Sequence, residues 1–209
     1  MATDGADREH PYVSRGGLKL EAALDAFGLS PTGWWCVDLG CSTGGFTDCL
    51  VQRGAERVFS VDTAYGELAW KLRNDERVTV MERSNALHTA PHADCVDRGG
   101  LDLAVIDLGW TPQARALPAT TPWLGPAGAI ISLIKPHYEK TSAEGGPRGA
   151  VVLDADDAER ITLEVVDRLR SEGYAVDGLI ESPVLGGKRK RRGGGQGNRE
   201  WLALVRPPR

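Results

Sequence analysis

Long apolar runs are absent from the 209-residue sequence. No stretch approaches the roughly 20 apolar residues that span a bilayer, which argues against a transmembrane helix. The first ten residues, MATDGADREH, are polar and acidic, so they lack the pattern of a secretory signal peptide. We therefore expect a cytoplasmic protein that has no membrane partner.

Cysteine is scarce and forms no C-x-x-C pair. Three of the four cysteines fall within one predicted strand–loop–helix unit; the four are Cys36, Cys41, Cys49 and Cys95. His88, His92 and His137 show no metal-ligand spacing either. These absences argue against a zinc site and a disulfide framework, and we expect no metal and four reduced thiols.

The excess of acidic over basic residues is small, because 25 Lys and Arg stand against 29 Asp and Glu for a formal charge of −4. Hydrophobic residues make up 41% and charged residues 26%, which excludes a collagen, a coiled coil or a wholly disordered chain. Six basic residues and no acid lie between Pro183 and Arg199, so subtracting these six from −4 leaves −10 on the rest of the chain. A basic segment on an acidic body indicates a local anionic partner.

Hydrophobic periodicity and turn residues predict strands that alternate with helices. The predicted strands are 35–39, 57–61, 78–81, 101–106, 128–134, 174–180 and 201–205, and the predicted helices are 15–27, 46–53, 65–74 and 154–171. This order predicts an α/β fold whose mostly parallel sheet carries helices on both faces. We expect a loose tail over residues 1–11 and a single domain over 12–209, with a basic glycine-rich loop at 186–199.

Charged side chains lie at the carboxyl ends of four predicted strands, where ligands of open α/β sheets bind. They are Asp38, Asp62, Asp107 and Lys135. The loop after the first strand is glycine-rich, but Ser42 occupies the place of the second glycine that lets a backbone approach a pyrophosphate. This substitution disfavours NAD and favours a nucleoside ligand without phosphates, such as S-adenosylmethionine.

Asp62 lies 24 positions after Asp38, near the offset of an acid that binds ribose hydroxyls. Loop, acid and alternating topology together predict a nucleoside site. The alternative is a tight turn that packs helix against strand, with Asp38 capping the helix.

Several longer motifs resemble one family. They are the segments 12–20 (YVSRGGLKL), 38–50 (DLGCSTGGFTDCL), 61–62 (VD), 65–73 (YGELAWKLR), 82–85 (ERSN) and 133–136 (LIKP). They are similar to the TlyA/hemolysin-A family of FtsJ/RrmJ-like ribosomal RNA 2′-O-methyltransferases, over nearly the whole chain. The resemblance implies a Rossmann-like class I methyltransferase fold, S-adenosylmethionine as cofactor and a Lys-Asp-Lys-Glu catalytic tetrad.

Carried over onto this sequence, the resemblance implies one set of catalytic and one set of cofactor-binding residues. The tetrad falls on Lys19, Asp107, Lys135 and Glu200. The cofactor-binding residues are Asp38, Gly40, Ser42, Gly44, Gly45, Phe46, Asp62, Asn85 and Asp107, with Asp62 at the ribose and Asn85 near the adenine.

The sequence departs from the family pattern in three places. Family members usually begin with an S4-type RNA-binding domain, whereas about eleven residues precede the first motif here. Asp107 is followed by Leu-Gly-Trp instead of Val-Ser-Phe, and a Lys/Arg/Gly loop precedes Glu200. These differences bear on the substrate more than on the methyl donor. Trp110 could stack on a target base or simply pack.

The chemistry of a ribose 2′-hydroxyl explains why such residues would be needed. This hydroxyl is a poor nucleophile, so catalysis requires in-line positioning and removal of one proton. A lysine whose pKa is lowered by burial or a second ammonium could accept the proton or stabilise the alkoxide, and Lys135 is the best candidate. Asp107 would hold Lys135, Lys19 would add positive charge, and Glu200 would orient the pair. A solvated strand end is the alternative for Lys135, and a snorkelling side chain for Lys19.

The basic loop before Glu200 is the candidate RNA contact. Its residues Lys188, Arg189, Lys190, Arg191 and Arg192 are flanked by glycines, as in RGG-type segments. We expect ribosomal RNA or a ribosomal subunit as partner, with a solvated linker as the alternative. A non-catalytic RNA-binding protein derived from such an enzyme, a methyltransferase for another RNA or a small molecule, and a nucleotide-dependent oxidoreductase are the competing functions.

Overall fold

The computed structural model describes residues 10–143, 152–187 and 197–208. Residues 1–9, most of the predicted tail, and the basic residues Lys188–Arg192 lie outside these ranges. Predictions about those two segments therefore stay predictions.

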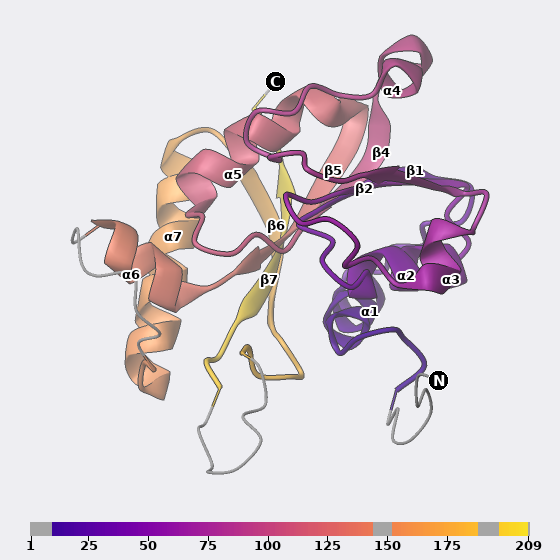
Figure 1. Cartoon of the computed structure of the whole chain (residues 1–209). Coiled ribbons are helices and arrows are strands. Elements are labelled where there is room, and N and C mark those ends of the chain that lie inside the picture. Colours follow the sequence, from indigo (N-terminus) through magenta and orange to yellow (C-terminus); the bar gives the residue numbers. More distant parts are fainter. Residues whose placement is uncertain (1–9, 144–151, 188–196, 209) are drawn as a thin grey trace.

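The described residues form a seven-stranded sheet in the order β3-β2-β1-β4-β5-β7-β6 (Figure 1). The strands are β1 Trp35–Leu39, β2 Arg57–Val61, β3 Val78–Met81, β4 Leu101–Ile106, β5 Leu124–Ile134, β6 Ala175–Glu181 and β7 Trp201–Arg206. Strands β1 to β5 pair in parallel, and β7 runs antiparallel to both β5 and β6. This confirms the predicted α/β class. The strand order reverses between β1 and β4, which is where such sheets bind ligands.

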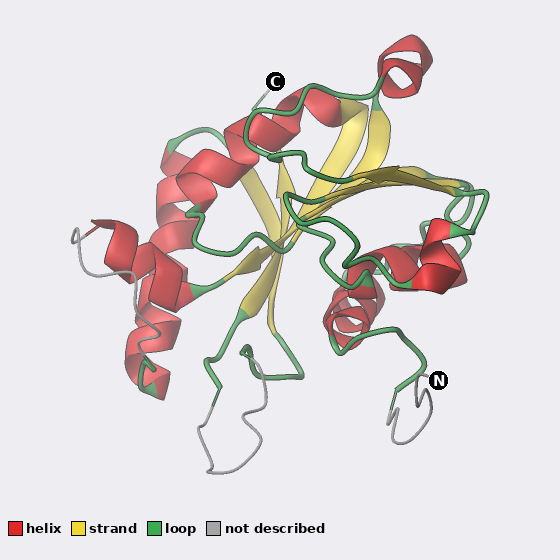
Figure 2. Cartoon of the chain, in the orientation of Figure 1, coloured by secondary structure: helices red, strands yellow, loops and turns green. Residues whose placement is uncertain are grey.

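Helices cover both faces of the sheet (Figure 2). They are α1 Gly16–Ala26, α2 Gly45–Gln52, α3 Trp70–Arg73, α4 Ala93–Arg98, α5 Gln113–Thr120, α6 Pro136–Ala143 and α7 Ala155–Ser171, with a short 3₁₀ turn at Thr121–Trp123. Helices α1 and α2 pack on one face through an apolar cluster, and α4, α5 and α7 contribute to a second cluster on the other.

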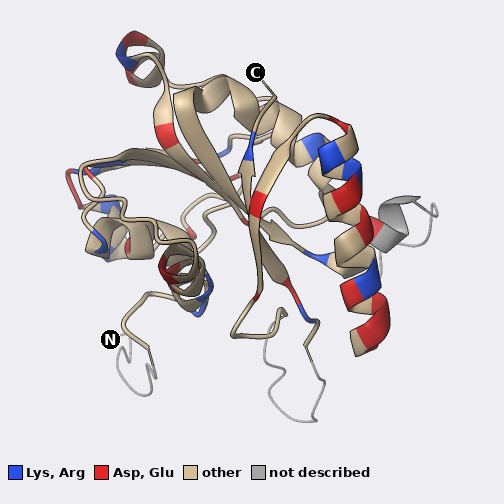
Figure 3. Ribbon diagram, turned by 180° about the vertical axis from the view of Figure 1, so that it is seen from behind, with Lys and Arg blue, Asp and Glu red and all other residues tan. Residues whose placement is uncertain are grey.

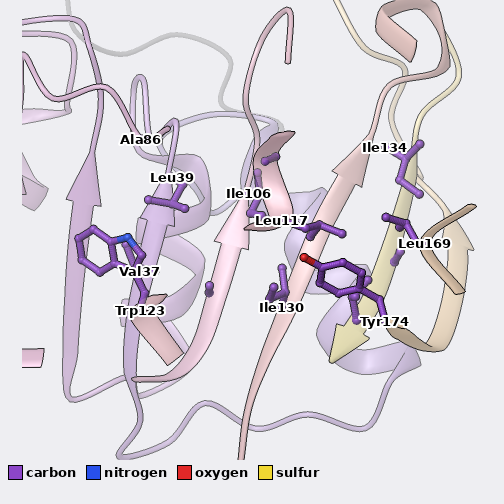
Figure 4. Packing of buried hydrophobic residues seen from close by; sticks show 14 of the residues in the cluster. Val37, Leu39, Ala86, Ile106, Leu117, Trp123, Ile130, Ile134, Leu169 and Tyr174 are labelled. Carbon is purple, nitrogen blue, oxygen red and sulfur yellow. The ribbon is translucent and has the colours of Figure 1, made fainter. Parts of the chain in front are cut away.

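Strand residues alternate between these two clusters, as the period of a β-strand requires. In β4, Leu103 and Val105 face α1 and α2, whereas Ala104 and Ile106 face the opposite cluster. Figure 4 shows that second cluster, in which the fully buried Trp123 lies beside the sheet. Burial of one large apolar side chain contributes roughly 1.5–3 kcal/mol, so the two clusters hold the helices against the sheet.

The structure corrects several predicted elements. A helix was expected over 65–74, but only Trp70–Arg73 is helical, because backbone hydrogen bonds hold the preceding segment elsewhere. The Gly66 N–H donates to Glu82, and the Ala69 N–H donates to the carbonyl of Thr43. Strand β5 begins at Leu124, four residues before the prediction, and helices α4, α5 and α6 were not predicted at all.

The long helix α7 has an acidic first turn and a basic last turn. Asp156 and Asp157 lie in that turn and Arg168 and Arg170 in the last, as the helix dipole favours. Figure 3 shows acidic and basic residues alternating along this outer helix. Among the described residues, no helix is long and apolar enough to cross a membrane, and no group of three or more His, Cys, Asp or Glu could hold a metal ion.

Candidate active site

Two adjoining cavities lie at the carboxyl ends of β1, β2 and β4. One has a volume of about 410 Å³ and is lined by residues that include Asp62, Asn85 and Trp110. The other, of about 230 Å³, is lined by residues that include Lys19 and Asp38. Both are lined by Gly40, Ser42 and Asp107, so they meet at the glycine loop. A nucleoside with a side arm could extend through both.

The glycine loop owes its shape to close backbone approaches. A Cβ on Gly40 would lie 2.8 Å from the carbonyl oxygen of Asp107, and a Cβ on Gly44 would overlap Leu72. Ser42, at the place of the second glycine, adopts the left-handed conformation with a φ of 47°. Its N–H donates to the Asp62 carboxylate at 2.8 Å, which fixes the loop against the end of β2.

Asp38 is fully buried and uses only one of its two carboxylate oxygens. Oδ2 accepts the N–H and hydroxyl of Thr47 at 2.9 and 2.7 Å, so Asp38 does cap α2. Oδ1 has no hydrogen-bond partner within the described part of the chain. Burial, with the charges of Asp107 and Asp62, raises the pKa of Asp38 to about 7, although Thr47 opposes the shift.

A cationic ligand in the adjoining cavity would compensate this orphaned acceptor. An unsatisfied buried carboxylate is costly, and a bound ammonium or sulfonium group would compensate it. S-adenosylmethionine carries both groups, so the residues present fit this cofactor.

The larger cavity has the polar groups that a nucleoside needs. Asp62 also accepts the Ala64 N–H at 2.8 Å, so its carboxylate is held at a fixed orientation. The Asn85 side chain accepts the Leu87 N–H at 3.0 Å and is fixed in the same way. Both residues line the larger cavity.

Lys19 and Glu200 meet across 181 residues of sequence. Their ammonium and carboxylate groups form a buried ion pair between α1 and the residue preceding β7. Gly186 makes room for this pair, because a Cβ at that position would overlap the Glu200 carboxylate. The Gly186 N–H donates to the Asn198 carbonyl at 2.8 Å, which closes the two ends of the basic loop beside Glu200.

Lys135 and Asp107 form the second ion pair, and Lys135 Nζ also donates to the Leu108 carbonyl at 3.1 Å. Burial tends to lower the pKa of Lys135, but the charges of Asp107 and Glu200 outweigh burial and raise the pKa above the ordinary lysine value. The prediction of a lowered pKa for Lys135 is therefore wrong for this state. A lysine that stays protonated can stabilise a developing alkoxide but cannot accept its proton.

Aromatic side chains line the approach to Lys135. Trp110 is half-exposed, has a φ of 56°, and packs its ring on Tyr138 with centroids 4.6 Å apart. Lys135 Nζ lies 5.8 Å from the centre of the Tyr138 ring. Burial and the ammonium groups of Lys135 and Lys19 lower the pKa of His137 to about 4, so this imidazole is neutral near pH 7.

Residues 12–192 match the family model for FtsJ-like methyltransferases. The chain belongs to this family. It is 42% identical over 180 residues to the 16S/23S rRNA (cytidine-2′-O)-methyltransferase TlyA of Mycobacterium tuberculosis, covering 86% of this chain and 66% of that protein. It is 34% identical over 194 residues to Hemolysin A of Brachyspira hyodysenteriae, covering 92% of this chain and 75% of that protein. The chain thus spans about two thirds of the length of the TlyA relative.

Solved structures agree with this family membership. A protein from Streptococcus thermophilus described as a candidate hemolysin is 36% identical and superposes with a TM-score of 0.78, over 96% of this chain and 68% of that one. The N-methyltransferase NodS from Bradyrhizobium japonicum, at 15% identity and a TM-score of 0.58 over 93% of this chain and 95% of that one, shares the fold alone. Family and fold imply S-adenosylmethionine as methyl donor.

Several residues of the site were not predicted from the sequence. Gly186 and Tyr138 contact members of the predicted tetrad without having been singled out, and His137 was noted only for its lack of metal-ligand spacing. Glu139, which contacts Gln113 behind the site, was not singled out either. Glycine before a basic run reads as a linker, so the sequence holds no signal for Gly186. Residues 137–139 follow Lys135-Pro136 directly, and recognition of a helix beginning at that proline would have pointed to them.

Proposed function

We propose that this protein is an S-adenosylmethionine-dependent methyltransferase that modifies a ribose 2′-hydroxyl of ribosomal RNA. The observation that carries the proposal is the convergence of two lysine–carboxylate pairs at the end of a cofactor-sized cleft. Lys19 with Glu200 and Lys135 with Asp107 neutralise each other, so the site suits an uncharged nucleophile. The activity in the names of TlyA relatives supports the same reaction. With ribosomal RNA as substrate, the protein would act in the cytoplasm.

The cofactor would lie along the glycine loop. Asp38 would face the cationic methionine end, Asp62 the ribose and Asn85 the adenine. Gly40 would let the loop lie close against the Asp107 carbonyl. Ser42, Gly45, Phe46 and Asp107 line the smaller cavity and would share this role. Gly44 lines neither cavity and would act by shaping the loop, because a Cβ there would overlap Leu72. When bound, S-adenosylmethionine supplies a methyl group already activated on a sulfonium.

The tetrad would act on the acceptor. Asp107 and the Leu108 carbonyl hold the Lys135 ammonium, whose charge would stabilise the negative charge that develops on the attacking oxygen. Because Lys135 is already protonated, the proton of the hydroxyl would leave to water as the methyl group is transferred. Lys19 and Glu200 fix the second side of the pocket, and Glu200 also acts electrostatically on Lys135. Trp110, half-exposed at the rim, would stack on the base of the target nucleotide.

RNA would be held by Lys188, Arg189, Lys190, Arg191 and Arg192, between the described ends Gly187 and Gly197. The described end of this segment hydrogen-bonds to Arg15, whose guanidinium donates to the Gly187 carbonyl at 2.9 Å beside the cavity. Replacing the five basic residues with Gly and Ser should weaken RNA binding and flatten its salt dependence by about 0.7–0.9 log units for each phosphate that is no longer neutralised. Equal slopes for both proteins would assign RNA contact elsewhere.

Methyl transfer itself is the decisive test. Tritiated S-adenosylmethionine is incubated with total RNA and with intact ribosomal subunits, and the labelled nucleotide is mapped. Label on a 2′-oxygen of ribosomal RNA is expected. RNA binding without transfer would instead identify a non-catalytic RNA-binding protein, and calorimetric binding of NAD but not S-adenosylmethionine would identify a nucleotide-dependent oxidoreductase.

A further inference from the structure

Glu139 is a buried carboxylate that the proposed chemistry does not use. It lies on α6, four residues after Lys135, and only 6% of its surface is exposed. Burial raises its pKa, against the opposing effect of the Gln113 N–H and Arg168. Burial of a charged carboxylate costs free energy of folding unless hydrogen bonds or ion pairs compensate it.

Those contacts link three helices. One Glu139 oxygen accepts the backbone N–H of Gln113, the first residue of α5, at 2.7 Å. The other accepts from Arg168 on α7 at 2.9 Å. Helix α5 begins after Pro112, which has no side-chain acceptor for the free N–H groups of the first turn. Glu139 therefore caps α5 from a different helix, and its negative charge suits the helix N-terminus.

Gln113 extends the same network to the strand that carries Lys135. Its side-chain amide donates to the Leu133 carbonyl at 3.2 Å, and its amide oxygen accepts the Ser132 hydroxyl at 2.6 Å. Both partners lie on β5, within three residues of Lys135. Gln113 is thus held from β5 by its side chain and from α6 by its backbone.

The segment between Asp107 and Gln113 is fixed at both ends as a result. At its start, the Asp107 N–H donates to the Leu39 carbonyl at 3.0 Å. At its end, the Gln113 N–H donates to the Glu139 carboxylate. Between these points lie Asp107 and the Leu108 carbonyl, both of which contact Lys135, and Trp110, which packs on Tyr138. Lys135 and Tyr138 lie where β5 passes into α6. The distance from this junction to the segment 107–113 therefore sets the geometry of the contacts of both residues.

We infer that Glu139 is a positioning residue for the acceptor half of the site: through Gln113 it holds the Asp107–Trp110 segment at the distance from Lys135 that methyl transfer requires. This inference rests on the proposed function. Glu139 contacts neither cavity, so its effect on cofactor binding is small. Misplacement of catalytic groups by about 1 Å costs about 10²-fold in rate, which sets the scale of the effect.

The test compares Glu139→Ala with Glu139→Gln. The alanine variant loses the acceptor for the Gln113 N–H, whereas glutamine keeps an amide oxygen that can accept it and loses only the charge. With rates normalised to sites that bind S-adenosylmethionine, Glu139→Ala should lower kcat by about 10- to 100-fold. The Kd for S-adenosylmethionine should stay within about twofold. Glu139→Gln should restore most of kcat, and hydrogen exchange at the Gln113 amide should be faster in the alanine variant only.

Val165→Ala, a substitution at a buried position on α7, is the control for reduced stability. It should lower the melting temperature while leaving kcat per site unchanged. Should Glu139→Ala fail to fold, Gln113→Ala removes the side-chain contacts to β5 and should lower kcat in the same direction.

Two negative outcomes are distinguishable. A wild-type protein that methylates no RNA overturns the proposed function and this inference with it. An active wild type whose Glu139→Ala variant has the same kcat per site overturns the inference alone, because the network would then serve stability only.

Discussion

The residues proposed for the cofactor and those proposed for the acceptor differ in how their charges are compensated. On the cofactor side, Asp38 is buried with one oxygen unpartnered among the described residues, and its pKa is raised to about 7. On the acceptor side, both lysines are matched by carboxylates, and the pKa of Lys135 is raised instead. The cofactor side is thus prepared for a cation, and the acceptor side for a neutral hydroxyl that becomes negative during the reaction.

This difference predicts that substitutions on one side leave the other side's function intact. The largest effect should come from Lys135→Ala, which removes the ammonium from the acceptor side. We expect kcat to fall by about 10²- to 10³-fold in single-turnover assays, with cofactor affinity nearly unchanged. A variant that keeps most of its activity would remove Lys135 from the catalytic set, and a large loss of cofactor affinity would break the separation of the two sides.

Asp62→Ala should show the opposite pattern. Losing hydrogen bonds to a charged acceptor costs roughly 1.5–3 kcal/mol, so the Kd for S-adenosylmethionine should rise about tenfold or more. At saturating cofactor kcat should change little, because Asp62 lies at the end of β2, on the other cavity from Lys19. Calorimetric titration measures the affinity, and an unchanged Kd would exclude Asp62 from the cofactor site.

Sequence reasoning served the two sides unequally. The proximity of the glycine loop and Asp62 could be predicted, because each lies at the end of a clear strand and the two fall within 25 residues. Lys19 and Glu200 lie 181 residues apart, and only the family resemblance singled them out. No spacing rule places such distant residues together, since that depends on how β7 pairs with β5.

The missed helices have a related cause. Helix α5 follows Pro112 without a capping side chain, and its cap is Glu139 on a different helix, so the usual local start signal is absent. Predicted helix 65–74 was too long for a similar reason: the Gly66 N–H is bonded to Glu82 on a neighbouring segment. At the start of α5 and at Gly66, a hydrogen bond to a residue distant in the sequence replaces the local hydrogen bond that sequence patterns indicate.

The unpaired oxygen of Asp38 should make cofactor binding depend on pH. Because its pKa stands near 7 without ligand, Asp38 is mostly protonated at pH 6 and mostly ionised at pH 8. A cationic ligand prefers the ionised form, so affinity should be about tenfold weaker at pH 6 than at pH 8. The sign for folding is opposite: the ligand-free protein loses stability as pH rises from the ordinary aspartate pKa through 7, since the folded state holds the proton longer.

Asp38→Asn is the matched control for this pH dependence. It should bind the cofactor weakly at every pH, and any slope that remains comes from groups other than Asp38. Equal slopes in the two proteins would show that Asp38 does not meet the cation.

The smallest effect is expected from Ser42→Gly, which sharpens the account of the cofactor side. Ser42 contributes its backbone N–H to Asp62, and glycine keeps that N–H while adopting the same left-handed φ without strain. Relief of strain is offset by the greater freedom of glycine in the unfolded chain, so stability should change by less than about 1 kcal/mol. Cofactor affinity should change by less than about threefold, a difference of well under about 1.4 kcal/mol. A tenfold loss would instead mean that the serine hydroxyl itself contacts the cofactor, and the loop would then bind through side chains as well as through its backbone.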